Sequence, residues 1–222
     1  MFANQKVLFL FAHMDDETIS SYGTIRRAAD EGAEVIVHCM CGLGRFPVTA
    51  DDERVQDERR AIFERYGHYV KFVSSRRCSD LSLTRYSAQK IFDETIRQYM
   101  PSIVVTHWAG DLHFEHRLLG QVSLVSCRRV PGSPIRQLWH VSSPMERWTY
   151  GQLERPFTPN LFVDTKKYEH VKRQMLDEYA KCELPEFPDL RSAESVIQYD
   201  RQNGRVAGLE MAEAYFKVFE VV

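Results

Sequence analysis

Short apolar segments alternate with segments of helical periodicity through the first half of the chain. The first apolar segment is Val7–Phe11, and in the following Thr18–Glu31 the residues Ile19, Tyr22 and Ile25 share one helix face. The alternation continues with strands predicted at Val35–His38, Tyr69–Val73 and Ile103–Thr106, and helices predicted at Asp51–Tyr66, Ser87–Tyr99 and from near Glu115 to before Pro131. This pattern predicts an α/β fold, a Rossmann-like three-layer αβα sandwich with a mostly parallel sheet.

The second half of the chain is less regular. Its predicted elements are strands at Gln137–Val141, Leu161–Val163 and Tyr215–Val221, a helix at Lys167–Lys181, and a helical region before the last strand. The sequence has no internal repeat, low-complexity segment or linker, and 222 residues are enough for one substantial core. We therefore expect a single domain over residues 1–222.

Composition argues against several classes of partner. The formal net charge of −2 gives no electrostatic reason to bind nucleic acid. No apolar run reaches the ~18 residues of a membrane span, and the N-terminus has the pattern of a strand and not of a signal peptide. The five cysteines are irregularly spaced without a CxxC pair, which favours reduced thiols and a cytoplasmic location. The pattern specifies no oligomeric state.

Two clusters of histidines and acids directly follow predicted strands. The first, "HMDDE", follows the first strand and contains His13, Asp15, Asp16 and Glu17. The second, "THWAGDLHFEHR", follows the fourth strand and contains His107, Asp111, His113, Glu115 and His116. Ligands of open parallel sheets bind beyond the carboxyl ends of the strands, so we expect the two clusters to face one site.

The types of side chain in these clusters favour a metal ion. A catalytic zinc commonly takes three nitrogen or oxygen ligands from the protein and keeps a fourth position open. Mixed imidazole and carboxylate ligands favour zinc or another first-row ion over calcium or magnesium. Either cluster alone could also be a helix cap or a solvated loop. Spacing does not distinguish Asp15 from Asp16, or His113 from His116, as ligands.

Both motifs resemble the paired signature of a known family. "AHMDDE", followed about 100 residues later by "DLHFEHR", is similar to the AHPDDE and HPDHR-like motifs of the PIG-L/LmbE-like deacetylases. The segments "NLFVDTKKYEHVKRQMLDEYAKC" and "NGRVAGLEMAEAYFKV" resemble later parts of that family, so the likeness covers most of the chain. The resemblance implies a zinc enzyme that removes the acetyl group from N-acetylglucosamine derivatives.

The resemblance also implies roles for individual residues. It makes His13, Asp16 and His116 the zinc ligands and Asp15 the general base. It makes His113 an assisting group for the tetrahedral intermediate, and we expect this histidine to be protonated. Three positions depart from the usual motifs: Met14 replaces a proline, and Phe114 and Glu115 replace a Pro-Asp pair. Glu17 is expected to orient His13 or to bond nearby backbone.

Three further residues are candidates for binding the substrate. In the family, an arginine near the position of Arg54 contacts the substrate, and an aspartate that contacts sugar hydroxyls has its nearest match in Asp80. The resemblance therefore implies that Arg54 and Asp80 bind the substrate. Arg54 could equally be a solvated helix residue among Asp51 and Asp52. Trp108 lies within the second cluster and could stack on a sugar face or belong to the core.

We expect zinc-dependent hydrolysis of an N-acetyl group on an N-acetylglucosamine-type amino sugar or its conjugate, with release of acetate and free amine. One alternative is a deacylase for an antibiotic intermediate or another non-sugar amide. Another is a relative without catalysis that binds metal or carbohydrate. Iron(II) or another divalent ion could replace zinc in such a site.

Overall fold

The computed structural model describes residues 1–40, 50–67, 69–74, 84–144, 156–182 and 191–222. The strands are β1 (Lys6–Phe11), β2 (Glu34–Cys39), β3 (Lys71–Ser74), β4 (Ile103–His107), β5 (Gln137–Val141), β6 (Leu161–Asp164) and β7 (Ala212–Glu220). The helices are α1 (Asp16–Asp30), α2 (Ala50–Tyr66), α3 (Arg85–Tyr99), α4 (Phe114–Ser126), the short 3-10 helix η2 (Lys166–Tyr168), α5 (Glu169–Cys182) and α6 (Ala193–Val206).

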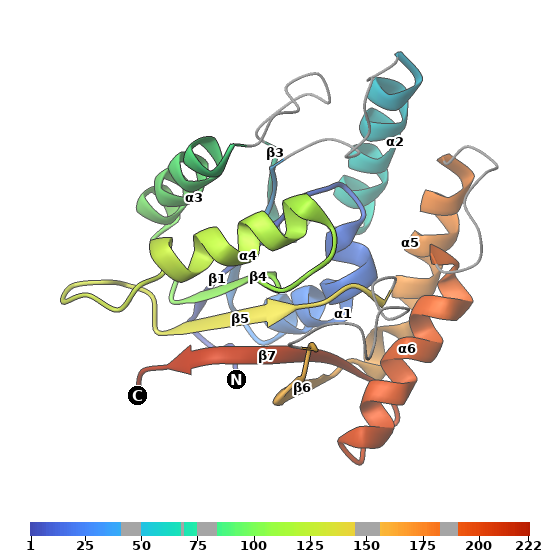
Figure 1. Ribbon diagram of the computed structural model, residues 1–222. Coiled ribbons are helices and arrows are strands. Elements are labelled where there is room, and N and C mark those ends of the chain that lie inside the picture. Colours follow the sequence, from blue (N-terminus) through green and yellow to red (C-terminus); the bar gives the residue numbers. More distant parts are fainter. Residues whose placement is uncertain (41–49, 68, 75–83, 145–155, 183–190) are drawn as a thin grey trace.

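The strands form one sheet in the order β3-β2-β1-β4-β5-β7-β6 (Figure 1). The five strands from β3 to β5 pair in parallel, and β7 pairs antiparallel with both β5 and β6. The chain runs outward from β1 in one direction through β2 and β3, and in the other direction through β4 and β5. The carboxyl ends of β1 and β4 therefore flank the point at which the order reverses, where such sheets bind ligands.

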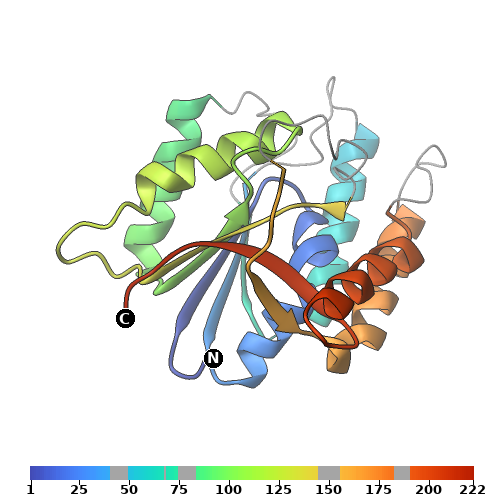
Figure 2. The same cartoon turned by 60° about the horizontal axis from the view of Figure 1, so that its bottom comes forward.

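The two faces of the sheet pack against different helices. Val7, Phe9 and Phe11 of β1 pack in a cluster with side chains of α1, α2 and α5. Leu8 and Leu10 point to the other face and pack with α3 and α4. This two-residue alternation buries both faces, and Figures 1 and 2 show the resulting helix–sheet–helix layers. The predicted α/β fold is confirmed. Among the described residues, no helix is long and apolar enough to cross a membrane.

Several element boundaries differ from the sequence prediction, and the starts of α1 and β7 show two of the reasons. Helix α1 begins at Asp16 rather than Thr18, because Asp15 is its N-cap and the acids of the first turn complement the helix dipole. Strand β7 begins at Ala212 rather than Tyr215. Glu213 interrupts the apolar pattern there, but its buried carboxylate is paired with Lys172 and so is tolerated inside the sheet.

Candidate metal centre

The turn between β1 and α1 presents the first cluster. The carbonyl oxygen of Asp15 accepts hydrogen bonds from the backbone nitrogens of Thr18 (3.0 Å) and Ile19 (2.8 Å), which starts the helix. Glu17 Oε2 accepts a hydrogen bond from the Asp15 backbone nitrogen at 3.0 Å. Glu17 thus bonds nearby backbone, one of the two arrangements expected for it. As a result, His13, Asp15 and Asp16 lie at the carboxyl edge of the sheet.

The loop between β4 and α4 presents the second cluster. His113 is the N-cap residue of α4, and Glu115 and His116 lie buried in its first turn. A Cβ atom added to Gly120 would lie only 2.4 Å from the backbone nitrogen of Ala109. Glycine at this position therefore lets α4 pack directly on the loop that follows β4, which brings His116 next to the first cluster.

Three donor atoms from the two clusters form a nearly equilateral triangle. His13 Nδ1 lies 3.3 Å from Asp16 Oδ2, Asp16 Oδ2 lies 3.3 Å from His116 Nε2, and His116 Nε2 lies 3.2 Å from His13 Nδ1. A tetrahedral ion with bonds of about 2.0–2.1 Å requires ligand atoms about 3.3 Å apart. The triangle therefore fits one zinc-sized ion with its fourth position outside the triangle.

The described residues contain two overlapping sets of side chains that could hold a metal ion, and His116 belongs to both. The sets are His13, His113 and His116, and Asp16, His107 and His116. His13, Asp16, His107 and His116 are each 5% exposed or less, whereas His113 is half-buried. Water competes poorly for donors buried in this way, so the arrangement is a candidate metal site.

Carboxylates contact the remaining ring nitrogens of two histidines in the triangle. His13 Nε2 lies 2.6 Å from Glu115 Oε2, and His116 Nδ1 lies 3.4 Å from Asp111 Oδ2. A carboxylate at one ring nitrogen keeps the proton there and leaves the other nitrogen as the donor to a metal. Glu115 thus favours Nδ1 of His13 as a ligand atom, and Asp111 favours Nε2 of His116.

The charges of the cluster favour a cation between these donors. Burial by itself lowers the pKa of His13, but hydrogen bonds to Asp16 and Glu115 outweigh it and raise the pKa to about 9. Burial also lowers the pKa of His116, but the Asp16 charge and the Asp111 contact raise it to about 10. Burial raises the pKa of Asp16, whereas the charge of His116 holds that pKa well below its usual value. The acids thus create a field that a divalent ion would satisfy.

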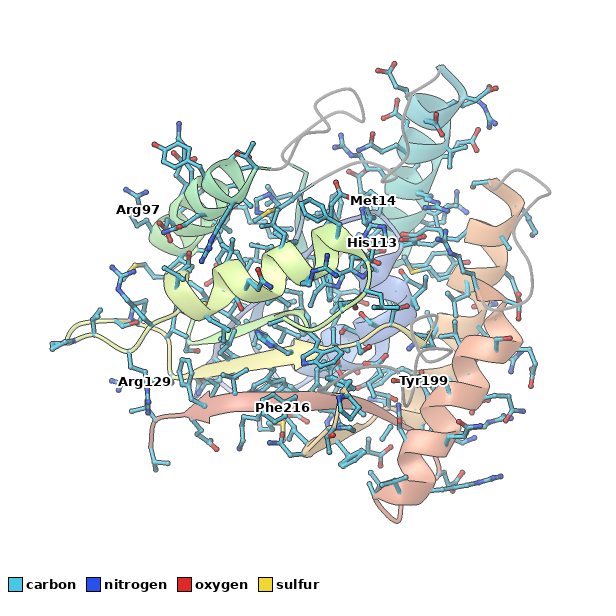
Figure 3. All side chains as sticks on the ribbon, viewed as in Figure 1. Met14, Arg97, His113, Arg129, Tyr199 and Phe216 are labelled. Atoms are coloured by element: carbon cyan, nitrogen blue, oxygen red, sulfur yellow. The ribbon has the colours of Figure 1, made fainter. Side chains whose placement is uncertain are left out.

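His113 lies against the two histidines of the triangle. Its ring centroid is 4.8 Å from that of His13 and 4.4 Å from that of His116, and Figure 3 shows it near Met14, which follows His13 in the chain. Burial, together with the charges of His116 and His13, lowers the pKa of His113 to about 4. This lowered pKa favours the neutral ring of His113, whereas we expected a protonated ring from the sequence.

His107 lies beside the triangle but has another partner. Its Nε2 accepts a hydrogen bond from the backbone nitrogen of Ala12 at 2.9 Å, which occupies the lone pair that a metal would need. Its ring stacks on that of His116 at 3.8 Å between centroids. His107 therefore ties the end of β1 to the His116 ring.

The predicted base, Asp15, directly precedes Asp16 of the triangle in the chain and is 6% exposed. Its Oδ2 lies 3.1 Å from Arg59 Nη1 of α2 and 3.4 Å from Arg191 Nη1, just before α6. Neither arginine was predicted to belong to the site. No motif marks them, and they reach Asp15 only because α2 and the start of α6 pack near the same end of the sheet.

The three residues predicted to bind substrate are in different surroundings. Arg54 is on the exposed side of α2, where its Nη1 lies 2.6 Å from Glu58 Oε1. Trp108 is half-buried, and its ring meets that of Phe157 edge-on at 5.7 Å between centroids. Asp80 lies outside the described residues.

Fold and site together define an α/β protein with a candidate His/Asp metal centre at the carboxyl edge of its sheet. Residues 8–126, more than half of the chain, match the profile of the PIG-L family, described as GlcNAc-PI de-N-acetylase. The chain belongs to the PIG-L family of metal-dependent deacetylases, and the resemblance predicted from the two motifs is confirmed. No curated protein matches the sequence.

Solved structures share the fold at low sequence identity. N,N′-diacetylchitobiose deacetylase from Pyrococcus horikoshii has a TM-score of 0.73 and 20% identity, over 96% of this chain and 84% of that chain. The zinc-inhibited form of teicoplanin deacetylase has a TM-score of 0.72 and 16% identity, over 96% of this chain and 97% of that chain. The 4-carboxy-2-hydroxymuconate hydratase GalB from Pseudomonas putida KT2440 has a TM-score of 0.68 and 17% identity, over 98% of each chain. At these identities the likeness shows the fold alone, and the fold carries more than one reaction.

Proposed function

We propose that this protein is a zinc-dependent N-deacetylase that removes the acetyl group from an N-acetylglucosamine-type amino sugar or its conjugate. The observation that carries this proposal is the triangle of His13 Nδ1, Asp16 Oδ2 and His116 Nε2, with edges of 3.2–3.3 Å. Asp15 directly precedes Asp16 in the chain. In this scheme the three triangle residues hold the ion, Asp15 is the general base and His113 assists.

The donor set supports zinc as the ion. Two imidazoles and one carboxylate suit zinc and iron(II), whereas calcium and magnesium prefer oxygen ligands alone. A bound zinc ion would supply a Lewis acid for the acetamide carbonyl and lower the pKa of a water molecule in the site.

The remaining chemistry falls to two side chains of the protein. Asp15 would accept a proton from the water that attacks the carbonyl carbon, and would return it to the nitrogen when the C–N bond breaks. His113 Nδ1 is buried and has no hydrogen-bond partner within the described part of the chain. As a neutral N–H donor, His113 would stabilise the negative charge that develops on the carbonyl oxygen. The products are acetate and the free amine.

The substrate class is supported by the family and by one of the structural neighbours. The family profile is described as a de-N-acetylase for an N-acetylglucosamine conjugate, and the named neighbours include a chitobiose deacetylase. We propose Trp108 as a stacking surface for the sugar ring, with Arg54 and Asp80 as candidates for its hydroxyl groups. The teicoplanin deacetylase neighbour favours an acylated glycopeptide as the alternative substrate.

Metal analysis combined with an acetate-release assay tests the proposal. The panel would contain N-acetylglucosamine, N,N′-diacetylchitobiose, an N-acetylated glycopeptide and an N-acetyl amino acid. We expect about one zinc or iron per chain and release from a sugar, lost on chelation and restored by zinc. Release only from the glycopeptide or the amino acid would shift the substrate class. Bound metal without release from any compound would favour a binding protein and contradict the proposal.

A further inference from the structure

Arg59 is a buried arginine next to the proposed general base. Its side chain is 2% exposed, and its Nη1 donates hydrogen bonds to Met14 O at 2.8 Å and to Asp15 Oδ2 at 3.1 Å. Its guanidinium also lies over the ring of Tyr179 of α5, 5.8 Å from the centroid. A buried guanidinium is unfavourable unless it is paired, and Met14 O and Asp15 Oδ2 are two acceptors that stabilise this one.

The backbone at Asp15 is unusual and is held from several sides. Its φ of 157° and ψ of −26° are a combination that few residues other than glycine adopt. Arg59 binds the carbonyl on one side of the Asp15 nitrogen and the carboxylate on the other, while Glu17 Oε2 accepts from the nitrogen itself. Tyr179 completes the ring of contacts, because its hydroxyl donates to Glu17 Oε1 at 2.9 Å.

We propose that Arg59 is a positioning residue for Asp15, an inference that rests on the proposed role of Asp15 as the base. Arg59 fixes the peptide and the carboxylate of Asp15 in the conformation that aims this side chain at the attacking water. Arg59 and Arg191 both contact Oδ2, so Oδ1 is the oxygen that accepts the proton. Met14 and Asp15 separate two ligands of the proposed ion, His13 and Asp16, but Arg59 itself contacts neither ligand through these bonds.

This arrangement predicts a defect in turnover rather than in metal or substrate binding. A misplacement of about 1 Å in a reacting group can cost about 10²-fold in rate. In Arg59→Ala we therefore expect kcat for acetate release to fall by about 10²-fold, with KM within about twofold and metal content still near one. Arg65→Ala is the matched control, because Arg65 lies on the same helix with an exposed side chain paired to Glu178. It should keep full turnover.

Guanidinium ion is a probe for the vacated position. Millimolar guanidinium chloride should restore part of the turnover of Arg59→Ala, whereas sodium chloride of equal concentration should not. Metal-free protein gives a readout independent of activity. Guanidinium should raise the Tm of metal-free Arg59→Ala saturably, and should not raise that of Arg65→Ala. This binding test remains valid even if the wild-type protein releases acetate from no compound, an outcome that would contradict the proposed function alone.

Arg59→Lys tests the inference if the alanine variant does not fold. A lysine is a point donor that cannot span the Met14 carbonyl and the Asp15 carboxylate as a guanidinium does. We expect Arg59→Lys to bind metal normally with kcat lowered by about 10-fold. Wild-type kcat in Arg59→Lys or Arg59→Ala would overturn the proposal. Loss of metal together with loss of rate would also overturn it, because Arg59 would then support the metal ligands and not the base.

Discussion

The candidate metal centre and the cluster formed by Lys172, Asp200 and Glu213 are both almost completely buried, but their charges are compensated differently. Lys172 Nζ lies 2.6 Å from Asp200 Oδ2 and 2.7 Å from Glu213 Oε1, and no member is more than 1% exposed. The lysine is a fixed cation, and Glu213 also accepts from two backbone nitrogens of α1. This cluster joins α1, α5, α6 and β7 without any further ligand.

The metal centre has no comparable fixed cation among its donor atoms. Asp16 Oδ2 faces three imidazole nitrogens at 3.3 Å, and two of these rings are held on their other side by Glu115 and Asp111. Positive charge in the triangle must therefore come from protons or from an ion. The two clusters are equally buried but serve different purposes. The lysine cluster stabilises the fold, whereas the metal centre is arranged to bind an ion.

Removing one donor of the triangle should have the largest effect. In His116→Asn we expect metal content to fall from about one to near zero and kcat to fall by more than about 10³-fold, because the ion supplies several kcal/mol of transition-state stabilisation. Elemental analysis and acetate release would measure this. His170→Asn, an exposed histidine on α5, is the control and should keep its metal. A His116→Asn protein with full metal content would show that the third ligand is another residue.

Asp15→Asn should separate the base from the ligands. The amide keeps the shape but is not basic, so kcat should fall by about 10²–10⁴-fold while metal content stays near one. Asp16→Asn should lose metal as well as rate. The exposed Asp57→Asn is the control for the chemical change itself. If Asp15→Asn loses the metal and Asp16→Asn keeps it, the two roles are exchanged.

Lys172→Met should show the opposite pattern from the metal-site variants. It leaves two buried carboxylates without their cation, so the free energy of unfolding should fall by about 3–5 kcal/mol. Metal content well below Tm should not change. Urea unfolding of the metal-free protein would measure the loss, and the exposed Lys166→Met should stay within about 0.5 kcal/mol of wild type. A normal stability in Lys172→Met would remove the distinction between the two clusters.

Glu115→Gln should give the smallest effect of the four. In the wild-type protein, Glu115 Oε2 lies 2.6 Å from His13 Nε2. The amide of the variant can still contact this nitrogen, but it does not carry the negative charge that strengthens His13 as a ligand. Metal affinity, measured against a competing chelator, should fall by about 10–100-fold. The exposed Glu53→Gln should match wild type. Unchanged affinity would mean that Glu115 does not act on the metal through His13.

Much of the fold and the core of the candidate site could be predicted from the sequence. The continuous apolar run Val7–Phe11 predicts a strand buried on both faces, and both faces of β1 are buried. The position of the two clusters after parallel strands predicted that they would meet, because the ends of such strands share one edge. The resemblance to the family, and not the spacing, singled out His13, Asp16 and His116 within them. The lowered pKa of His113 could not be predicted, since it depends on the burial of the ring and on the charges of the neighbouring histidines.

The sequence by itself determined the order of elements and the two clusters at the strand ends, because these features depend on residues close together in the chain. The tertiary structure decided which nitrogen of each histidine faces the triangle and which distant side chains complete the site. Arg59 and Asp15 are 44 residues apart, and Lys172 and Glu213 are 41 apart. Such pairs form only when helices α2 and α5 pack on the sheet. The local periodicity of a helix does not predict which distant residue its long side chains will contact.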